Sequence, residues 1–267
     1  MLVEAHGIAS ADDAWLRFTT PATWSVWAPM IRSVEASDDE LVVGTTGRVQ
    51  GPPGVAVDFE VTAVDPEQRT WSWRAGRGPA EVTMDHHVVP AAGGVSRAFL
   101  RVPGRSAPLL QPYRVPAAAA LRGLVRDRSG IGGEEEPVQV FDFAFTRAYA
   151  AAGRPFGVSR RSTTVELGPQ WLYVRYGPWR LLTPRSNIAS AEATGGFSFV
   201  KTAGPPHLSF SDRGVSFTTN GDRALCLRFH EPVPAIDPAA TILHPGATIS
   251  VADPEGLAAA LDLAYDV

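Results

Sequence analysis

The feature that most constrains the fold of this chain is a change of hydrophobic period at Pro29. Before Pro29, Trp24 and Trp27 stand three residues apart, which places both indoles on one face of a short helix. After it, apolar and polar residues alternate, and Trp71 and Trp73 fall on the same side of an extended segment. Short helices followed by half-buried antiparallel strands predict an α+β domain in the first half of the chain.

Polar residues mark the ends of two expected helices. Ser10 is predicted to cap the first helix, and Asp12 and Asp13 in its first turn complement the helix dipole. Asp253 is predicted to cap a terminal helix that carries Pro254 at its first position. Both signals fix where a helix begins.

A strand over residues 3–8 opens the first half, and a helix over 109–126 is expected to close it. Pro112 and Pro116 should delay the regular part of this closing helix to about Ala117, because proline disfavours a helical conformation in the residue before it. Between them the chain predicts a run of antiparallel strands, one of which carries Val57, Phe59 and Val61 on a single face. A later strand, with Val82 and Val88 on one face, is expected to turn at residues 90–94 into the last strand.

Residues 126–137 are the best candidate for a domain boundary. Glycines loosen this segment, three consecutive glutamates repel one another, and Pro137 stops any preceding helix. We therefore predict one domain at 1–128, a linker at 129–137 and a second domain at 138–267.

The second half reads almost entirely as strand. Turn signals such as Gly177-Pro178 and Asn220-Gly221 separate the segments. Many short antiparallel strands and one final helix predict a small barrel or sandwich that the helix plugs at one end. The expected strands are Thr163–Leu167, Trp171–Tyr176, Trp179–Thr183, Ile188–Thr194, His207–Ser211, Val215–Thr219, Ala224–Phe229 and Thr248–Val251.

Composition excludes several classes of function. A formal net charge of -4 gives no reason to expect nucleic-acid binding. The single cysteine, Cys226, excludes an internal disulfide and a paired-cysteine metal site. The sequence has no apolar run of about 18 residues, the length of a spanning helix, and no leader pattern, so we expect a cytoplasmic protein without integral membrane association.

The aromatic residues of the first half are candidates for the wall of an apolar cavity that takes a hydrophobic small molecule. Their rings bury about 150–250 Å² each, and they fall on faces that point toward a common interior. The alternative is that they simply fill the core. The proposed ligand-binding residues are Trp24, Trp27, Phe59, Trp71, Trp73, Met84 and His86.

His86 shares a strand face with Met84 and Val88, so its imidazole should point inward. There it could orient a ligand or act as a general acid or base, or it could be a core histidine whose polar atoms are satisfied by neighbours. His87 faces the other way, so the pair cannot chelate one metal ion. We expect neither a metal nor a cofactor, and no nucleophile or phosphate-loop motif is present.

The first half resembles the polyketide cyclase/dehydrase and lipid-transport branch of the START-like (SRPBCC) superfamily over residues 1–128. The resemblance implies a helix-grip fold, in which an antiparallel sheet wraps around a C-terminal helix and encloses a ligand cavity. It is carried by the order and spacing of Trp24-x-x-Trp27-x-Pro29, Gly44-Thr45, Phe59-Glu-Val-Thr-x-x-Asp65-Pro66, Thr70-Trp-Ser-Trp73 and His86-x-Val-x-Pro90.

The second half is similar to bacterial pleckstrin-homology-like barrels. Its strand-rich order with a terminal helix, together with Gly177-Pro-Trp-Arg180 and Thr183-Pro184, carries that likeness. The likeness implies no functional residues.

Three classes of function follow. The chain is a binding protein for a hydrophobic small molecule such as a lipid or a polyketide-like compound, or a cyclase or dehydratase that uses His86 as its acid/base, or an interaction protein whose tryptophans fill a collapsed cavity.

Overall fold

The computed structural model of this chain describes residues 1–78, 81–92, 95–103, 110–126, 137–208, 213–236, 242–262 and 265–266. Two compact units divide the chain, the first including Met1–Glu136 and the second consisting of Pro137–Asp237 and Ile242–Val267. The linker predicted at 129–137 lies outside the described residues, apart from Pro137.

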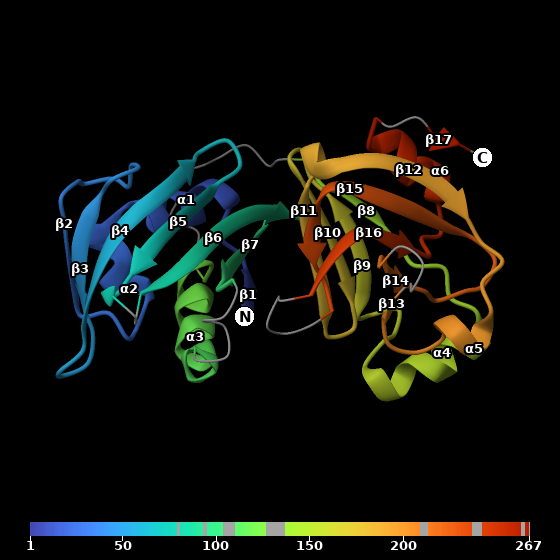
Figure 1. The fold of residues 1–267 in the computed structure, drawn as a ribbon, viewed down its shortest axis with the longest axis horizontal. Coiled ribbons are helices and arrows are strands. Elements are labelled where there is room, and N and C mark those ends of the chain that lie inside the picture. Colours follow the sequence, from blue (N-terminus) through green and yellow to red (C-terminus); the bar gives the residue numbers. More distant parts are fainter. Residues whose placement is uncertain are drawn as a thin grey trace. The chain divides into compact units, whose positions relative to one another are not determined.

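The first unit is built on one antiparallel sheet of seven strands in the order β1-β7-β6-β5-β4-β3-β2 (Figure 1). Its edge strand β2 is short and has no buried side chain. The strands are β1 (Leu2–Gly7), β2 (Ser33–Ala36), β3 (Thr46–Gln50), β4 (Ala56–Asp65), β5 (Thr70–Ala75), β6 (Val82–Ala91) and β7 (Val95–Arg101).

The helices of this unit are α1 (Ala11–Thr19), α2 (Trp24–Trp27) and α3 (Arg114–Leu124), with single 3-10 turns at Pro21–Thr23 and Gln111–Tyr113. α1 packs against β6 and β7, and α3 packs against β1 and β7. The core lies between these helices and the sheet. This is the helix-grip arrangement of an α+β domain.

The caps predicted for this unit hold, but its closing helix begins earlier than the prolines suggested. The Ser10 hydroxyl accepts a hydrogen bond of 3.0 Å from the Asp13 amide. α3 starts at Arg114 instead of Ala117. Pro116 is its third residue, where a backbone N–H would have no partner within the helix in any case, so the proline is tolerated.

Two glycines set how closely α3 approaches its neighbours. A Cβ added at Gly7 on β1 would lie 2.0 Å from the carbonyl oxygen of Val125, just beyond α3. A Cβ at Gly123 on α3 would lie 2.0 Å from the carbonyl oxygen of Trp27 at the end of α2. Backbone therefore rests on backbone at both places, which only glycine permits.

The described strands of the second unit form two sheets, not the closed barrel expected from the sequence. One has the order β11-β10-β9-β8 and the other β13-β14-β16-β15-β12-β17, with parallel pairs at β14–β16 and β12–β17. Strand lengths and turns can be read from a sequence, but barrel closure depends on pairing between distant strands, which periodicity does not encode.

The second unit has three α-helices among its described residues, and a 3-10 turn follows α4 at Arg154–Phe156 and β11 at Arg185–Asn187. The Asp253 carboxylate accepts a hydrogen bond of 2.9 Å from the Gly256 amide, which is the predicted cap of the last helix. The elements are β8 (Gln139–Phe141), α4 (Arg147–Gly153), β9 (Thr163–Leu167), β10 (Trp171–Tyr176), β11 (Trp179–Pro184), β12 (Ile188–Thr194), α5 (Phe199–Thr202), β13 (His207–Leu208), β14 (Val215–Phe217), β15 (Ala224–Pro234), β16 (Leu243–Ile249), α6 (Pro254–Ala260) and β17 (Tyr265–Asp266).

Strand bounds in the second unit agree best where turns flank the strand on both sides. β9, β10 and β12 have the predicted bounds. β15 extends to Pro234, and β16 begins at Leu243 instead of Thr248, because pairing between the two strands carries both through proline and glycine positions. The predicted end of β13, at residues 209–211, lies outside the described residues, as do residues 93–94 of the predicted first-unit turn.

No helix in the described part of the chain is long and apolar enough to cross a membrane.

Candidate functional site

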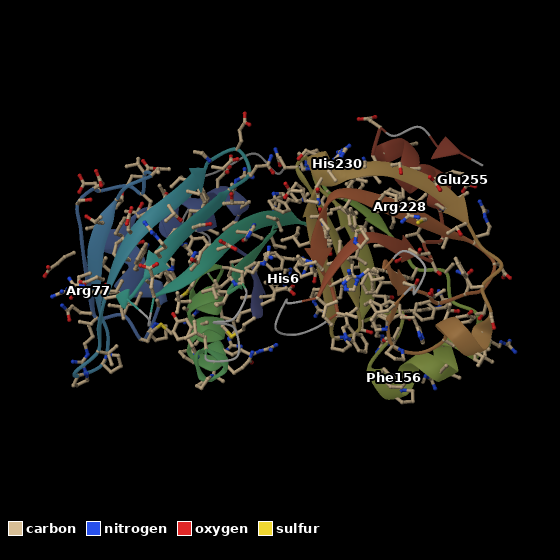
Figure 2. All side chains as sticks on the ribbon, in the orientation of Figure 1. His6, Arg77, Phe156, Arg228, His230 and Glu255 are labelled. Carbon is tan, nitrogen blue, oxygen red and sulfur yellow. The ribbon has the colours of Figure 1, made fainter. Side chains whose placement is uncertain are left out.

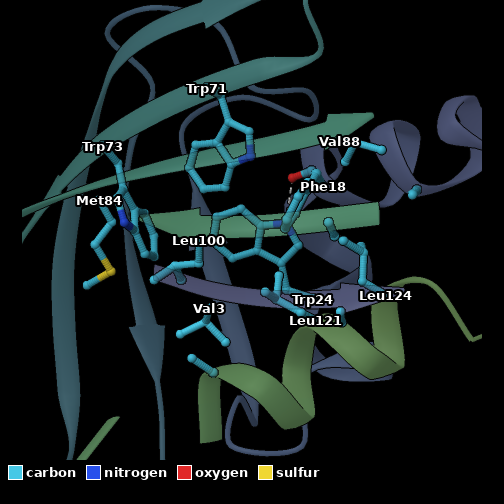
Figure 3. Packing of buried hydrophobic residues seen from close by; sticks show 14 of the residues in the cluster. Val3, Phe18, Trp24, Trp71, Trp73, Met84, Val88, Leu100, Leu121 and Leu124 are labelled. Atoms are coloured by element: carbon cyan, nitrogen blue, oxygen red, sulfur yellow. Dashed lines mark hydrogen bonds between the residues drawn. The ribbon is translucent and has the colours of Figure 1, made fainter. Parts of the chain in front are cut away.

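Aromatic side chains from five elements meet in the core of the first unit (Figure 3). α1 and α2 supply them from one side, and β4, β5 and β6 from the other. All are buried except Trp27, which is half-buried. We call this group the aromatic cluster; it consists of Phe18, Trp24, Trp27, Phe59, Trp71, Trp73 and His86.

The rings of the aromatic cluster pack directly on one another. Trp71 and His86 stack face to face, with ring centroids 4.0 Å apart and an interplanar angle of 8°. Trp24 stacks on Trp71, with ring centroids 5.7 Å apart. Phe18 packs edge-on against the imidazole of His86, with ring centroids 5.5 Å apart. Such stacked and edge-to-face pairs stabilise a core beyond the area that they bury.

The structure thus brings the predicted ligand-binding residues together. Met84 is also buried on the inner face of β6, directly opposite Trp73 in the adjacent strand. Phe59 contacts the same indole, with ring centroids 5.1 Å apart. Whether these residues bind a ligand stays a prediction.

Four polar atoms in the cluster have no hydrogen-bond partner among the residues that the structure describes. They are the indole nitrogens of Trp27, Trp71 and Trp73 and the Nδ1 atom of His86. Trp24 differs, since its indole N–H donates to the backbone carbonyl of Phe18 at 2.9 Å. A buried polar group without a partner costs about 1–3 kcal/mol, so four of them in one cluster call for a physical explanation.

The imidazole of His86 is uncharged near neutral pH. Burial in this apolar setting is the main cause that lowers the pKa of His86 to about 3, and the charge of the adjacent His87 lowers it further. A backbone hydrogen bond with Trp71 acts in the opposite direction without restoring the ordinary value. At pH 7 only about one His86 in ten thousand would carry a second proton.

The interior is nearly filled, which differs from the hollow domain expected from the sequence. A void of about 40 Å³ lies against Trp27, Trp71, Trp73 and His86. Pockets that bind small molecules usually measure about 300–1,000 Å³, so this void is too small for a lipid. The indoles fill the space because they interlock with Leu121 and other residues of α3.

A much larger recess, which we call the groove, lies next to this void. It has a volume of about 1220 Å³ and is formed by residues of β1, α1, α2 and α3 and the segments beside them. Among the described residues, Trp27 alone lines both this recess and the interior void. The indole of Trp27, itself a member of the cluster, therefore borders both spaces. The groove is lined by His6, Gly7, Ile8, Leu16, Arg17, Thr20, Thr23, Val26, Trp27, Pro29, Ala119, Arg122, Gly123 and Arg126.

Within the described residues, no three potential metal ligands lie close enough together to hold an ion. His86 and His87 are consecutive on β6, so their side chains leave opposite faces of the sheet. The two imidazoles therefore cannot coordinate one metal ion.

Comparison with protein families now identifies the first unit. Residues 4–130 match the family described as "Polyketide cyclase / dehydrase and lipid transport". The N-terminal unit is an SRPBCC-type domain. The description of that family points to hydrophobic small molecules as ligands, without naming one for this chain. No curated protein matches the chain.

Several solved structures resemble slightly less than half of the chain. A protein from Nitrosospira multiformis is 15% identical, has a TM-score of 0.39, and the match covers 47% of this chain and 92% of that one. Norcoclaurine synthase from Thalictrum flavum is 21% identical with a TM-score of 0.35, covering 47% and 83%. Major latex-like protein 151 from Panax ginseng is 14% identical with a TM-score of 0.38, covering 46% and 93%.

Sequence reasoning missed two parts of this SRPBCC-type domain. Phe18 was not among the ligand-binding candidates, although its ring contacts the imidazole of His86. The groove was missed entirely, because Arg17 and Arg122 look like ordinary cations in the last turns of α1 and α3. Only the packing of those two helices shows that both side chains border one recess.

Proposed function

We propose that the SRPBCC-type domain binds a hydrophobic small molecule, either a lipid or a polyketide-like compound, at the aromatic cluster. The observation that carries this proposal is the set of four unpartnered polar atoms on Trp27, Trp71, Trp73 and His86. A core that served packing alone would gain stability if apolar atoms replaced these groups. A ligand that offers hydrogen-bond acceptors would satisfy them.

The chemistry of these atoms indicates what kind of ligand fits. Three are indole N–H groups, which can only donate a hydrogen bond. The ligand should therefore carry carbonyl or hydroxyl oxygens on an otherwise apolar body. Burial of that body would supply the driving force, at about 25 cal/mol per Å² of apolar surface.

Access to the cluster leads through the groove. The void of about 40 Å³ excludes a lipid-sized guest unless a side chain moves. Trp27 is the side chain that borders both spaces, and it is less buried than Trp24 or Trp71. We infer that a ligand enters from the groove and displaces the indole of Trp27.

We infer that binding occurs without catalysis. His86 was the candidate acid/base of a cyclase or dehydratase, but a histidine whose pKa lies at about 3 is almost never in its charged acid form at pH 7, and its neutral imidazole is a weak base. Its role in this proposal is that of a neutral hydrogen-bonding group.

We further propose that the protein is cytoplasmic and has no nucleic-acid partner, in keeping with its net charge of -4. The likeness of the second unit to pleckstrin-homology-like domains and the domain bounds given above remain predictions.

The test compares two ring systems that differ in one oxygen. Fluorenone carries a carbonyl acceptor and fluorene does not, so tryptophan fluorescence titration should show fluorenone binding about fivefold more tightly, the value of one neutral hydrogen bond. That ratio should fall toward one in at least one of Trp27→Phe, Trp71→Phe and Trp73→Phe. Because it is a ratio, it cancels any general weakening of the fold.

Trp179→Phe, in the second unit, is the matched control and should leave the ratio unchanged. The proposal fails if neither compound binds. It also fails if both bind equally well to the natural protein, or if the ratio survives all three substitutions and His86→Leu. Native mass spectrometry of the purified protein should in addition show a co-purifying adduct of small-molecule mass.

A further inference from the structure

The groove beside Trp27 combines apolar side chains with positive charge. Ile8, Leu16 and Val26 line it and are 56%, 42% and 85% exposed. Its charged residues are all basic: Arg17, Arg122 and Arg126, joined by His6 on β1 (Figure 2). None of the described residues that line it is Asp or Glu. In a chain whose net charge is -4, this local excess of cations is notable.

Ordinary helix electrostatics explains these arginines only in part. Arg17 lies in the last turn of α1 and donates a hydrogen bond of 2.7 Å to the carbonyl oxygen of Leu124. It thereby satisfies a carbonyl at the C-terminal end of α3. Arg122, in the last turn of α3, is exposed, and the described residues offer it neither a hydrogen bond nor an ion pair. With respect to the described residues, its guanidinium is available to a ligand.

We propose that the groove binds a single-chain amphipathic anion, with its carboxylate at Arg122 and Arg17 and its hydrocarbon chain directed toward Trp27. This inference rests on the proposed function and specifies its ligand class. Guanidinium groups recognise carboxylates through charge-assisted, often paired hydrogen bonds. The described lining offers Arg122 no carboxylate, so the carboxylate of a bound ligand would meet a cation there without competing with an acidic side chain of the groove.

The shape of the groove favours an individual molecule over a membrane surface. Small-molecule pockets usually measure about 300–1,000 Å³, and a recess of about 1220 Å³ can enclose one chain and its head group. The exposed aliphatic residues line this recess together with the arginines, so the chain and the head group can be bound at once. Contact between the recess and the interior void at Trp27 also offers the end of the chain a route inward.

The test uses three probes with the same chain, namely laurate, dodecanol and dodecyltrimethylammonium, each below its micelle-forming concentration. Calorimetric titration of the full chain should give laurate the highest affinity, about tenfold above dodecanol, and the cation the lowest. Arg122→Gln should remove most of the laurate advantage while leaving dodecanol binding unchanged. Arg114→Gln is the matched control, because Arg114 is exposed on the same helix but does not line the groove.

Each outcome decides between the two proposals. If dodecanol binds as well as laurate, or if Arg122→Gln leaves the laurate affinity within twofold, the anion inference is overturned and the proposed function stands. If neither laurate nor dodecanol binds and fluorenone also fails, both are overturned. If the protein binds vesicles of anionic phospholipid but none of the three probes, the groove is a membrane-docking surface and the inference is overturned.

Discussion

Replacing Gly123 by alanine should push α2 away from α3. Whether the free energy of unfolding then falls or rises shows which effect dominates, the overpacking of the contact or the higher helix propensity of alanine. The added Cβ would lie 2.0 Å from the carbonyl oxygen of Trp27 and 3.0 Å from its carbonyl carbon. Non-bonded contacts of a Cβ essentially never fall below 3.0 Å, so the two backbones must separate by at least 3.0 − 2.0 = 1.0 Å. Both contacting groups are backbone, so no side chain can rotate out of the way.

Two opposing terms set the magnitude. Alanine in a helix interior is favoured over glycine by about 0.8–1 kcal/mol. Overpacking of a fitted contact costs about 1–3 kcal/mol. Because backbone must move, we take the upper part of that range, and the free energy of unfolding should fall by about 1–2 kcal/mol. If Gly123 were an ordinary helix residue, the same substitution would raise it by about 1 kcal/mol.

Urea unfolding followed by tryptophan fluorescence measures this change, since five of the seven tryptophans lie in the first unit. Ala119→Gly on the same helix calibrates the propensity term and should cost about 1 kcal/mol. An increase in stability for Gly123→Ala would refute the close contact between α2 and α3. Separation of the helices at Trp27 should also speed ligand access to the cluster, which stopped-flow titration with fluorenone would detect.

Three other changes test the core. Trp24→Phe should lower the free energy of unfolding by about 2–4 kcal/mol, because it removes a satisfied buried indole N–H and leaves a void; Trp27→Phe should cost less, since its indole nitrogen has no partner among the described residues. His86→Leu should flatten the loss of stability in acid. The folded-state pKa of His86, about 3, lies below the unfolded value of 6.5, so its neutral form is fully retained above pH 6.5 and its contribution is lost as the pH falls toward 3. Urea titrations at pH 6.5 and pH 5 should thus show a decline about 2 kcal/mol steeper in the natural protein than in the variant. Tyr176→Phe should cost about 1–2 kcal/mol by thermal unfolding, because the buried hydroxyl donates to the carbonyl of Thr218 at 2.7 Å.

Each of these has a contrary result. Equal losses for the two tryptophan variants would mean that the unpartnered nitrogen of Trp27 is satisfied in solution. An unchanged acid slope in the His86 variant would mean that water reaches the imidazole. No effect of Tyr176→Phe would place its hydroxyl in contact with solvent.

Local patterns in the sequence foretold much of the first unit. Trp71, Trp73 and His86 do share one interior, because the period of two in β5 and β6 fixes which side chains point inward. The Ser10 cap could also be predicted, since a hydroxyl at that position accepts a hydrogen bond from an amide only three residues away. α3 was placed three residues late because Pro116, the cue that was used, is harmless in a first turn.

What the sequence alone determined is which side chains of the alternating strands share a face and where several elements begin or end, since both depend on residues close together in the chain. It did not determine the volume left between those side chains. That volume depends on the distance between α3, α2 and the sheet, and the backbone contacts at Gly7 and Gly123 set this distance. Only the tertiary structure therefore decided that the aromatic cluster is filled, that a groove opens at Trp27, and that the strands of the second unit form two sheets.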